Sequence, residues 1–262
     1  NTMIDRYKLS QFYQGKGSET QYSNFQTVND EVFSIENLQI VSLATDFPQG
    51  TSQKVRQEAE RKWIDTLPKL TKVKALSVRH RVRNDFFEAI CEMRSLERLT
   101  FWTSTVDEIS SISKLTKLVF LKLWSFSRLR DISALLQLKK LKILSIDNCF
   151  KVENYELISQ MTQLVGLELC GDTFAPRNLR IKSLRPFETL KNLKHLDLSS
   201  ASVIDKSYDS IAQMKNLERF DLVVTVPKEV RDKIKAEHKN LKAGFFVDYD
   251  FENKKLYDGK QW

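Results

Sequence analysis

The chain has 262 residues, of which 41% are hydrophobic and 29% charged, and it carries a formal charge of +8. This balance is typical of a soluble globular protein, and no stretch reaches the roughly 18 consecutive apolar residues that a membrane helix needs. The N-terminus, Asn-Thr-Met-Ile-Asp-Arg, is polar and contains no apolar signal core.

One short leucine pattern recurs along the chain and defines its elements. An irregular copy occupies residues 35–43, and clear copies such as Leu115-Thr-Lys-Leu-Val-Phe-Leu-Lys-Leu follow it. The apolar residues of each copy alternate, which is the period of a strand with one buried face. Aligning the regular copies on their middle apolar residue gives steps of 22 to 29 residues between Val73, Leu96, Leu118, Leu141, Leu164, Leu193, Leu217 and Leu241.

Self-similarity at this period in an LxxLxL frame resembles the leucine-rich-repeat family. The resemblance covers residues 35–247 and implies an α/β solenoid. The expected shape is a right-handed arc with a parallel β-sheet on its concave face and helices or 3₁₀ turns on its convex face. We expect residues 1–34 to form an N-terminal cap and residues 248–262 a C-terminal capping tail, because repeat arrays need covered ends.

The segments between the predicted strands differ in length. Residues 52–66 have the apolar spacing of a helix, and Asn84 offers an N-cap to an amphipathic run ending at Met93. Residues 109–114 and 132–137 have room for about one helical turn. Pro227 fits the first turn of a helix that continues through the following residues.

The longest step between neighbouring copies contains an insertion at residues 171–180. Extra residues in a solenoid emerge as a loop, often on the side used for binding. Phe174, Arg177 and Arg180 would extend a concave binding site at its rim, although a merely tolerated insertion explains them equally well.

Three cysteines, Cys91, Cys149 and Cys170, are too few for a disulfide framework, and their odd count leaves at least one thiol unpaired. Free thiols suit a reducing compartment, and the sequence has no N-x-Ser/Thr sequon. We therefore expect a cytoplasmic protein. Export after removal of a signal stays open, because the chain does not begin with Met.

Residues that lie between the inward leucines should point into the concave face. On three successive strands these positions form an aromatic–basic cluster, which we expect to bind a partner because Trp, Phe and Arg are enriched at interface hot spots. The alternative is that the two indoles only stack on each other across neighbouring strands. The cluster comprises Arg79, Arg98, Trp102, Phe120, Lys122 and Trp124.

A carboxylate strip follows on the next strands and comprises Asp147, Glu168, Asp197 and Asp221. It would dock and steer a basic region of a partner. Alternatively, Arg219 and His195, two residues before Asp221 and Asp197, neutralise it locally. A metal site is the least favoured interpretation, because one ladder column rarely converges on a single ion.

Catalysis is not expected. His195, Asp197 and Ser199 share one strand face, but residues two apart along a strand are about 6.6–6.8 Å apart, too far for a nucleophilic triad. The sequence contains no CxxC, HExxH, P-loop or GxGxxG motif, so it predicts no catalytic residue, cofactor or metal.

The sequence therefore predicts a non-enzymatic scaffold, a monomer when unbound, that recognises a protein in its concave face as an adaptor, receptor or inhibitor. An exported, adhesin-like recognition module is the alternative. A nucleic-acid binder comes third, because the turn lysines are dispersed along the rod rather than gathered in a groove.

Overall fold

The computed structural model describes residues 21–23, 28–40, 47–172, 177–223, 226–250 and 255–256. Most of the predicted N-terminal cap, the end of the irregular first copy and most of the C-terminal tail lie outside these ranges. Phe174 of the predicted insertion loop also lies outside them. The described chain forms two compact units, an N-terminal unit that ends at Leu141 but includes residues 151–154, and a C-terminal unit made of the remaining residues from Lys142 onward.

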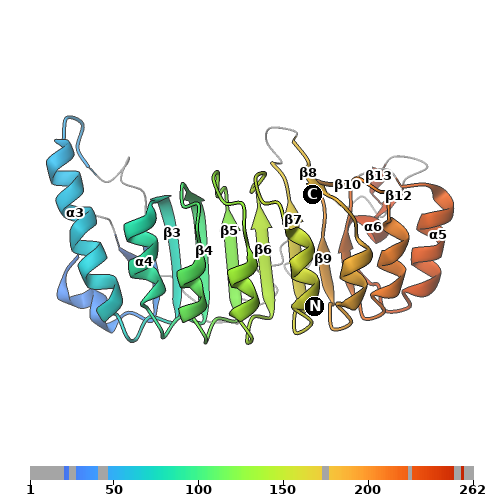
Figure 1. The fold of residues 1–262 in the computed structure, drawn as a ribbon, viewed down its shortest axis with the longest axis horizontal. Coiled ribbons are helices and arrows are strands. Elements are labelled where there is room, and N and C mark those ends of the chain that lie inside the picture. The colour runs from blue at the N-terminus through green and yellow to red at the C-terminus, as the bar shows by residue number, and fades with distance from the viewer. Residues whose placement is uncertain are drawn as a thin grey trace. The chain divides into compact units, whose positions relative to one another are not determined.

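The N-terminal unit contains parallel strands in chain order. Each strand pairs with the next, from β1 through β2, β3 and β4 to β5, so that Leu76 lies beside Leu99 and Leu99 beside Leu121 (Figure 1). The register between β3 and β4 shifts once, between Val78 and Arg81. Parallel neighbours need a crossover connection, and here each repeat supplies its own. The strands are β1 (Gln21–Ser23), β2 (Asn37–Ile40), β3 (Ala75–Val82), β4 (Arg98–Ser104) and β5 (Phe120–Trp124).

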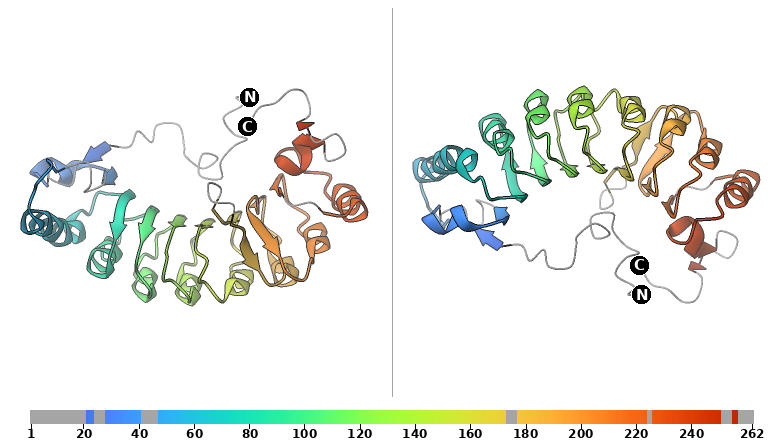
Figure 2. Two further views of the ribbon diagram at one scale, coloured as in Figure 1. Left: turned by 90° about the horizontal axis from the view of Figure 1, so that it is seen from above. Right: turned by 90° about the horizontal axis from the view of Figure 1, so that it is seen from below.

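The C-terminal unit continues the same pattern, with β6 pairing β7, β7 pairing β9 and β9 pairing β11, all in parallel. Its strands are β6 (Ile143–Asp147), β7 (Gly166–Cys170), β9 (His195–Asp197) and β11 (Arg219–Asp221). In both units the strands of the main ladder lie on one side and the helical segments of the crossovers between them on the other (Figure 2). This arrangement is the leucine-rich-repeat architecture that the leucine pattern predicts.

Most crossovers carry a short 3₁₀ helix. In the N-terminal unit these are η2 (Asp30–Ser34), η3 (Leu67–Lys69), η4 (Ser110–Lys114) and η5 (Ser133–Gln137). In the C-terminal unit they are η6 (Tyr155–Gln160), η7 (Arg185–Thr189) and η8 (Tyr208–Gln213). Two of them match the one-turn segments predicted from the sequence.

The longer crossovers form α-helices where the sequence predicts them. Helix α3 (Gln53–Thr66) begins after Ser52, whose side chain accepts a hydrogen bond from the Val55 N–H and so satisfies an otherwise unpaired donor. Helix α4 (Asn84–Cys91) has Arg83, not Asn84, in the capping position, so the predicted start is off by one residue. Helix α5 (Lys228–Glu237) follows Pro227 directly.

The inward side chains of the repeats form the core of each unit. Leu96, Leu99 and Phe101 of one repeat are fully buried, and so are Leu121 and Leu123 of the next. Burying a leucine side chain contributes about 1.5–3 kcal/mol, and the ladder repeats this contribution in every copy. The predicted alternation therefore has the correct side facing inward.

The insertion adds a feature that the sequence did not predict. Strand β8 (Leu179–Ile181) pairs in parallel with β10 (Ala201–Val203) in a separate two-stranded sheet within the C-terminal unit. Strand β8 thus begins in the last two residues of the predicted insertion, after the main ladder strand β7 has ended.

The far edge of β11 is covered by the chain itself. Phe220 donates its backbone N–H to the carbonyl of Ala243, and its ring packs against Phe246 of α6 (Phe245–Asp248) with centroids 5.1 Å apart. Beyond α6, β12 (Tyr249–Asp250) pairs antiparallel with β13 (Lys255–Leu256). Covering an edge strand removes a template for aggregation.

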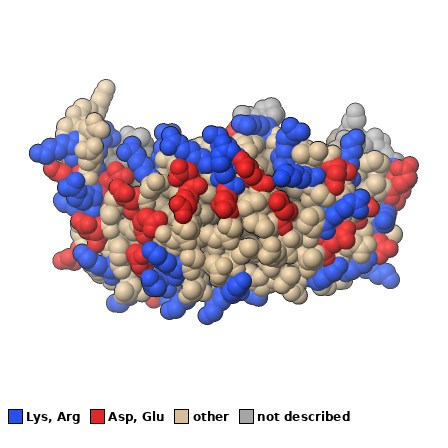
Figure 3. Space-filling view, viewed as in Figure 1, with Lys and Arg blue, Asp and Glu red and all other residues tan. Residues whose placement is uncertain are grey.

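Charges on the face that carries the helices are mixed rather than gathered. Lysine and arginine are interspersed with aspartate and glutamate across this face (Figure 3). Exposed pairs such as Lys114–Glu92 and Lys194–Glu218 link some of them. Within the ranges given above, no helix has the length and apolar character needed to cross a membrane.

Candidate recognition surface

The open face of the N-terminal unit, opposite its helical segments, carries the aromatic–basic cluster. Strands β3, β4 and β5 place their outward positions side by side, so that Thr100 lies between Ser77 and Lys122. Trp102 and Trp124 lie on this face and are half-buried, while the intervening leucines and Phe101 point into the core. All six predicted cluster residues therefore come from three adjacent strands of one unit.

Trp102 is held at the centre of the cluster. Its indole N–H donates to the Ser77 hydroxyl at 3.3 Å, which fixes the ring orientation. The Trp124 ring lies 4.6 Å away, centroid to centroid, and is tilted by 43°. The guanidinium of Arg79, from the opposite neighbouring strand, lies 4.5 Å from the Trp102 centroid. The two indoles do stack, as the structural alternative requires, but they stack within a surface that also gathers cations.

Phe120 occupies the same face but lies underneath another residue. Its side chain is only 2% exposed, and the Arg98 guanidinium lies over its ring at 4.5 Å. Burial lowers the pKa of Arg98. Since Phe120 is covered, a partner at this position would meet the Arg98 side chain rather than the phenyl ring. Lys122 completes the cluster, with its ammonium 5.7 Å from the Trp124 centroid.

The carboxylate strip lies in the C-terminal unit. Glu168, Asp197 and Asp221 occupy matching positions on three neighbouring strands, as predicted. They are less open than a docking strip requires, because Asp221 is 2% and Glu168 9% exposed. Arg219 donates to Asp221 at 2.6 Å, so one carboxylate is neutralised by the residue the sequence pattern suggested.

Burial and crowding alter the acid–base properties of the strip. The pKa of Asp197 rises to about 7, first because burial disfavours its charged form and then because Asp221 and Glu168 lie beside it. The pKa of His195 falls to about 4 through burial and the nearby Arg219. His195 is therefore neutral at pH 7 and does not neutralise Asp197, contrary to the sequence-based alternative.

One prediction about distances is wrong. The strand spacing puts Ser199 too far from Asp197 for a hydrogen bond, but its backbone N–H donates to Asp197 Oδ1 at 2.8 Å and its hydroxyl donates to the same oxygen. The reason is that β9 ends at Asp197 and the chain turns there, which brings Ser199 back toward the carboxylate. Ser199 thus donates hydrogen bonds to a carboxylate at the end of a strand, which is the geometry of a turn and not of a nucleophilic triad.

His80 and the three cysteines take structural positions. His80 points into the core, where its ring meets Phe86 edge-on at 4.6 Å, and burial lowers its pKa to about 4. The three thiols are buried, and the Cys170 thiol lies 3.5 Å from Asp197 Oδ1. In the part of the chain that the structure describes, no group of three or more His, Cys, Asp or Glu residues has the arrangement of a metal site.

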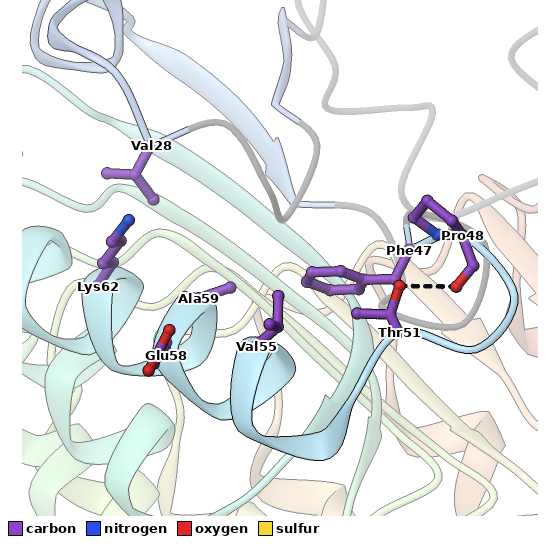
Figure 4. Close-up of a pocket in the computed structure, with 8 residues that line it drawn as sticks. All are labelled: Val28, Phe47, Pro48, Thr51, Val55, Glu58, Ala59 and Lys62. Carbon is purple, nitrogen blue, oxygen red and sulfur yellow. Dashed lines mark hydrogen bonds between the residues drawn. The ribbon is translucent and has the colours of Figure 1, made fainter.

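A pocket of about 260 Å³ lies beside α3 in the N-terminal unit. Val55 and Ala59 of the helix face the ring of Phe47, and the Thr51 hydroxyl donates to the Pro48 carbonyl at 2.7 Å (Figure 4). No sequence motif pointed to this pocket. Its lining mixes apolar side chains with the polar Thr51, Glu58 and Lys62; the lining residues are Val28, Phe47, Pro48, Thr51, Val55, Glu58, Ala59 and Lys62.

Solved structures confirm the architecture. An internalin from Listeria monocytogenes matches with a TM-score of 0.59 at 16% identity, over 81% of this chain and 54% of its own. A leucine-rich-repeat protein from Leptospira interrogans matches with a TM-score of 0.53 at 20% identity, over 84% of this chain and 51% of its own. The chain thus spans about half the length of each. No protein-family model and no curated protein sequence matches it.

The chain therefore has the leucine-rich-repeat fold. A fold does not imply a function, so the role of this chain has to be argued from its own surface.

Proposed function

We propose that this protein is a non-enzymatic recognition scaffold whose open face on β3, β4 and β5 binds a partner protein. The observation that carries the proposal is the pair of indoles, Trp102 and Trp124, on a sheet face that does not contribute to the leucine core. Nothing in the repeat requires large rings at these positions, and half-buried indoles leave apolar area for a partner to cover.

The geometry suits an interface hot spot. The Ser77 hydroxyl and the neighbouring Arg79 guanidinium hold Trp102 in one orientation before any partner arrives. Binding therefore loses little side-chain entropy at this position, and preorganisation of this kind increases affinity. Tryptophan and arginine are the residue types that most often dominate binding free energy at interfaces.

The test is the Trp102→Ala/Trp124→Ala double variant. We expect it to bind the native partner at least about 30-fold more weakly than the wild type, because truncating a hot-spot residue typically costs about 2 kcal/mol or more. Partners captured from native lysate by the wild type are identified, purified and titrated against both proteins by calorimetry.

The matched control is Phe33→Ala, which removes an aromatic side chain that is 42% exposed but lies in η2, off the open face. It should bind as the wild type does. Circular dichroism and thermal unfolding establish that the double variant folds. Unchanged affinity in a folded double variant would show that the two rings serve only the sheet.

We also propose that the protein resides in a reducing compartment such as the cytoplasm. The support is that Cys91, Cys149 and Cys170 are all buried thiols rather than disulfides. Cell fractionation of the native protein with an antibody tests this, and recovery from the medium or the cell surface would favour the exported recognition module instead.

A further inference from the structure

We propose that the aromatic–basic cluster recognises an extended acidic segment of its partner protein. This inference rests on the function proposed above and adds the chemistry of the ligand. It follows from the charge of the surface, from the way its cations are held and from the spacing of its side chains.

The charge of the surface is strongly one-sided. The first three outward positions of each of β3, β4 and β5, all of them in the described part of the chain, together hold three cations, three aromatic rings and no carboxylate. Arg81, exposed farther along β3, adds a fourth cation. A surface of this sign attracts a negatively charged partner and repels a positive one, so charge complementarity selects an acidic segment.

Two arginines of the cluster hold their guanidinium groups in an orientation that suits binding of carboxylates. Arg79 lies over Trp102 and Arg98 over Phe120, each with its guanidinium carbon 4.5 Å from the ring centroid. A guanidinium that lies over a ring has its N–H donors around its edge, where a carboxylate can accept two of them side by side. The rings thus hold these donors in place and leave less side-chain motion to be lost on binding.

The spacing of the side chains favours an extended ligand. Outward residues recur about every 6.6–6.8 Å along a strand and about every 4.8 Å across neighbouring strands. Alternate side chains of an extended peptide have the same spacing along their chain. Acidic residues at alternate positions can therefore face the sheet together and reach the cations of successive rows, Arg98, Lys122 and Arg79, while the residues between them point away from the surface.

The same geometry disfavours a nucleic acid. Sequence-tolerant binding of single strands depends on ring faces on which bases stack. Trp102 lies between Arg79 on one neighbouring strand and Trp124 on the other, and Phe120 is covered by Arg98. With these faces occupied, the cluster presents ring edges and cations, which suit carboxylates and aliphatic groups better than bases.

The experiment uses three labelled probes on the full chain. The first is a peptide of about 12 residues with Glu at alternate positions and Leu or Ser between them; the second replaces every Glu with Lys; the third is an oligothymidylate of similar length. Fluorescence anisotropy measures their affinities at about 50 mM and about 500 mM salt, since screening should weaken a charge-driven contact.

The informative variant is Arg79→Glu/Lys122→Glu, and its control is Lys139→Glu/Lys140→Glu. The control makes the same change in net charge at two exposed lysines in the turn before β6. We expect the first variant to bind the Glu peptide at least 10-fold more weakly and to gain affinity for the Lys peptide. The control should retain at least half of the wild-type affinity, because salt screens exposed charges that lie more than about a Debye length from the peptide.

Several results would overturn the inference: no binding of the Glu peptide below about 1 mM, equal binding of the Glu and Lys peptides, no effect of charge reversal, or tighter binding of the oligothymidylate that is lost in the same variant.

The two proposals fail separately. A captured partner that needs Trp102 and Trp124 but ignores the reversal leaves the proposed function intact, whereas a partner indifferent to both indoles refutes that function whatever the peptides do.

Discussion

Replacing Gly171 with alanine should destabilise the protein by about 3 kcal/mol or more. A Cβ at this position would lie 2.1 Å from the Arg177 carbonyl oxygen, 2.6 Å from the Leu179 nitrogen and 2.8 Å from the Ser200 carbonyl oxygen. All three are backbone atoms that cannot rotate away. Overpacking a filled site typically costs about 1–3 kcal/mol, and a clash with backbone on several sides belongs at or above the upper end.

The clash arises from the way the insertion is attached. The Ser200 carbonyl accepts hydrogen bonds from both Gly171, at 2.9 Å, and Leu179, at 2.8 Å. These bonds draw the end of β7, the start of β8 and the turn before β10 against one another. Thermal unfolding should show a midpoint about 6–12 °C lower for the variant, since 1 kcal/mol shifts a protein of this size by about 2–4 °C.

Two other glycines supply matched comparisons. Gly50 has a φ of +87° with nothing within 4 Å of an added Cβ. Gly50→Ala should therefore destabilise the protein only by the strain of a left-handed backbone, about 1–2 kcal/mol. Gly244 combines a φ of +103° with an approach of 2.2 Å to the Phe220 carbonyl oxygen, so Gly244→Ala should be at least as severe as Gly171→Ala. A Gly171→Ala protein as stable as Gly50→Ala would contradict the argument.

The repeat sequence predicted the fold well because the pattern is redundant. Each copy places leucine at the same inward positions, and a strand that slipped by one residue would expose its whole apolar side. The same rule correctly assigned the outward direction of Trp102 and Trp124 and the alignment of Glu168, Asp197 and Asp221. The direction in which a side chain points follows from the period of the repeat, and the residues beside it follow from the register of the strands.

The period of the repeat does not predict which outward side chains are covered by their neighbours, or where the chain turns at the end of a strand. Phe120 points outward, as the register requires, yet Arg98 lies over it, because a long side chain on the next strand can fold across its neighbour. Ser199 reaches Asp197 because the strand ends between them, which the alternation of residues does not reveal. His195 loses its charge through burial, which depends on what surrounds it rather than on its position in the repeat.

The pH dependence of stability should change when Asp197 is replaced by asparagine. In the unfolded chain this carboxyl has an ordinary pKa near 3.8, whereas in the folded protein its pKa is about 7. Between these values the folded state holds a proton that the unfolded state releases. The contribution of Asp197 to stability is therefore fully present below about pH 3.8, declines as the pH rises from there through about 7 and is constant above that.

An asparagine side chain in this place would resemble the protonated acid at every pH, and its oxygen can still accept from Ser199. We expect Asp197→Asn to be more stable than the wild type by about 2–3 kcal/mol at pH 8, after discounting the solvent that reaches a half-buried group, and equally stable near pH 4. Thermal midpoints of both proteins from pH 4.5 to 8.5 test this.

The difference between the two pH profiles is the informative quantity. His80 and His195, with pKa values lowered to about 4, act with the opposite sign between about pH 4 and 6.5, but they are present in both proteins and cancel. A constant gap between wild type and Asp197→Asn across the range would mean that Asp197 keeps its charge in the fold.

Asp205→Asn is the control for this experiment. Desolvation alone would raise the pKa of Asp205, but its hydrogen bonds with Ser207 and Ser183 and the nearby Arg185 outweigh that effect and lower the pKa. This variant should therefore be less stable than the wild type by a constant amount above about pH 4, and the difference should shrink only as the pH falls below the ordinary pKa of 3.8. If Asp197→Asn behaved like this control, the strip would be a charged surface available for docking rather than a row of carboxylates that share burial and repulsion.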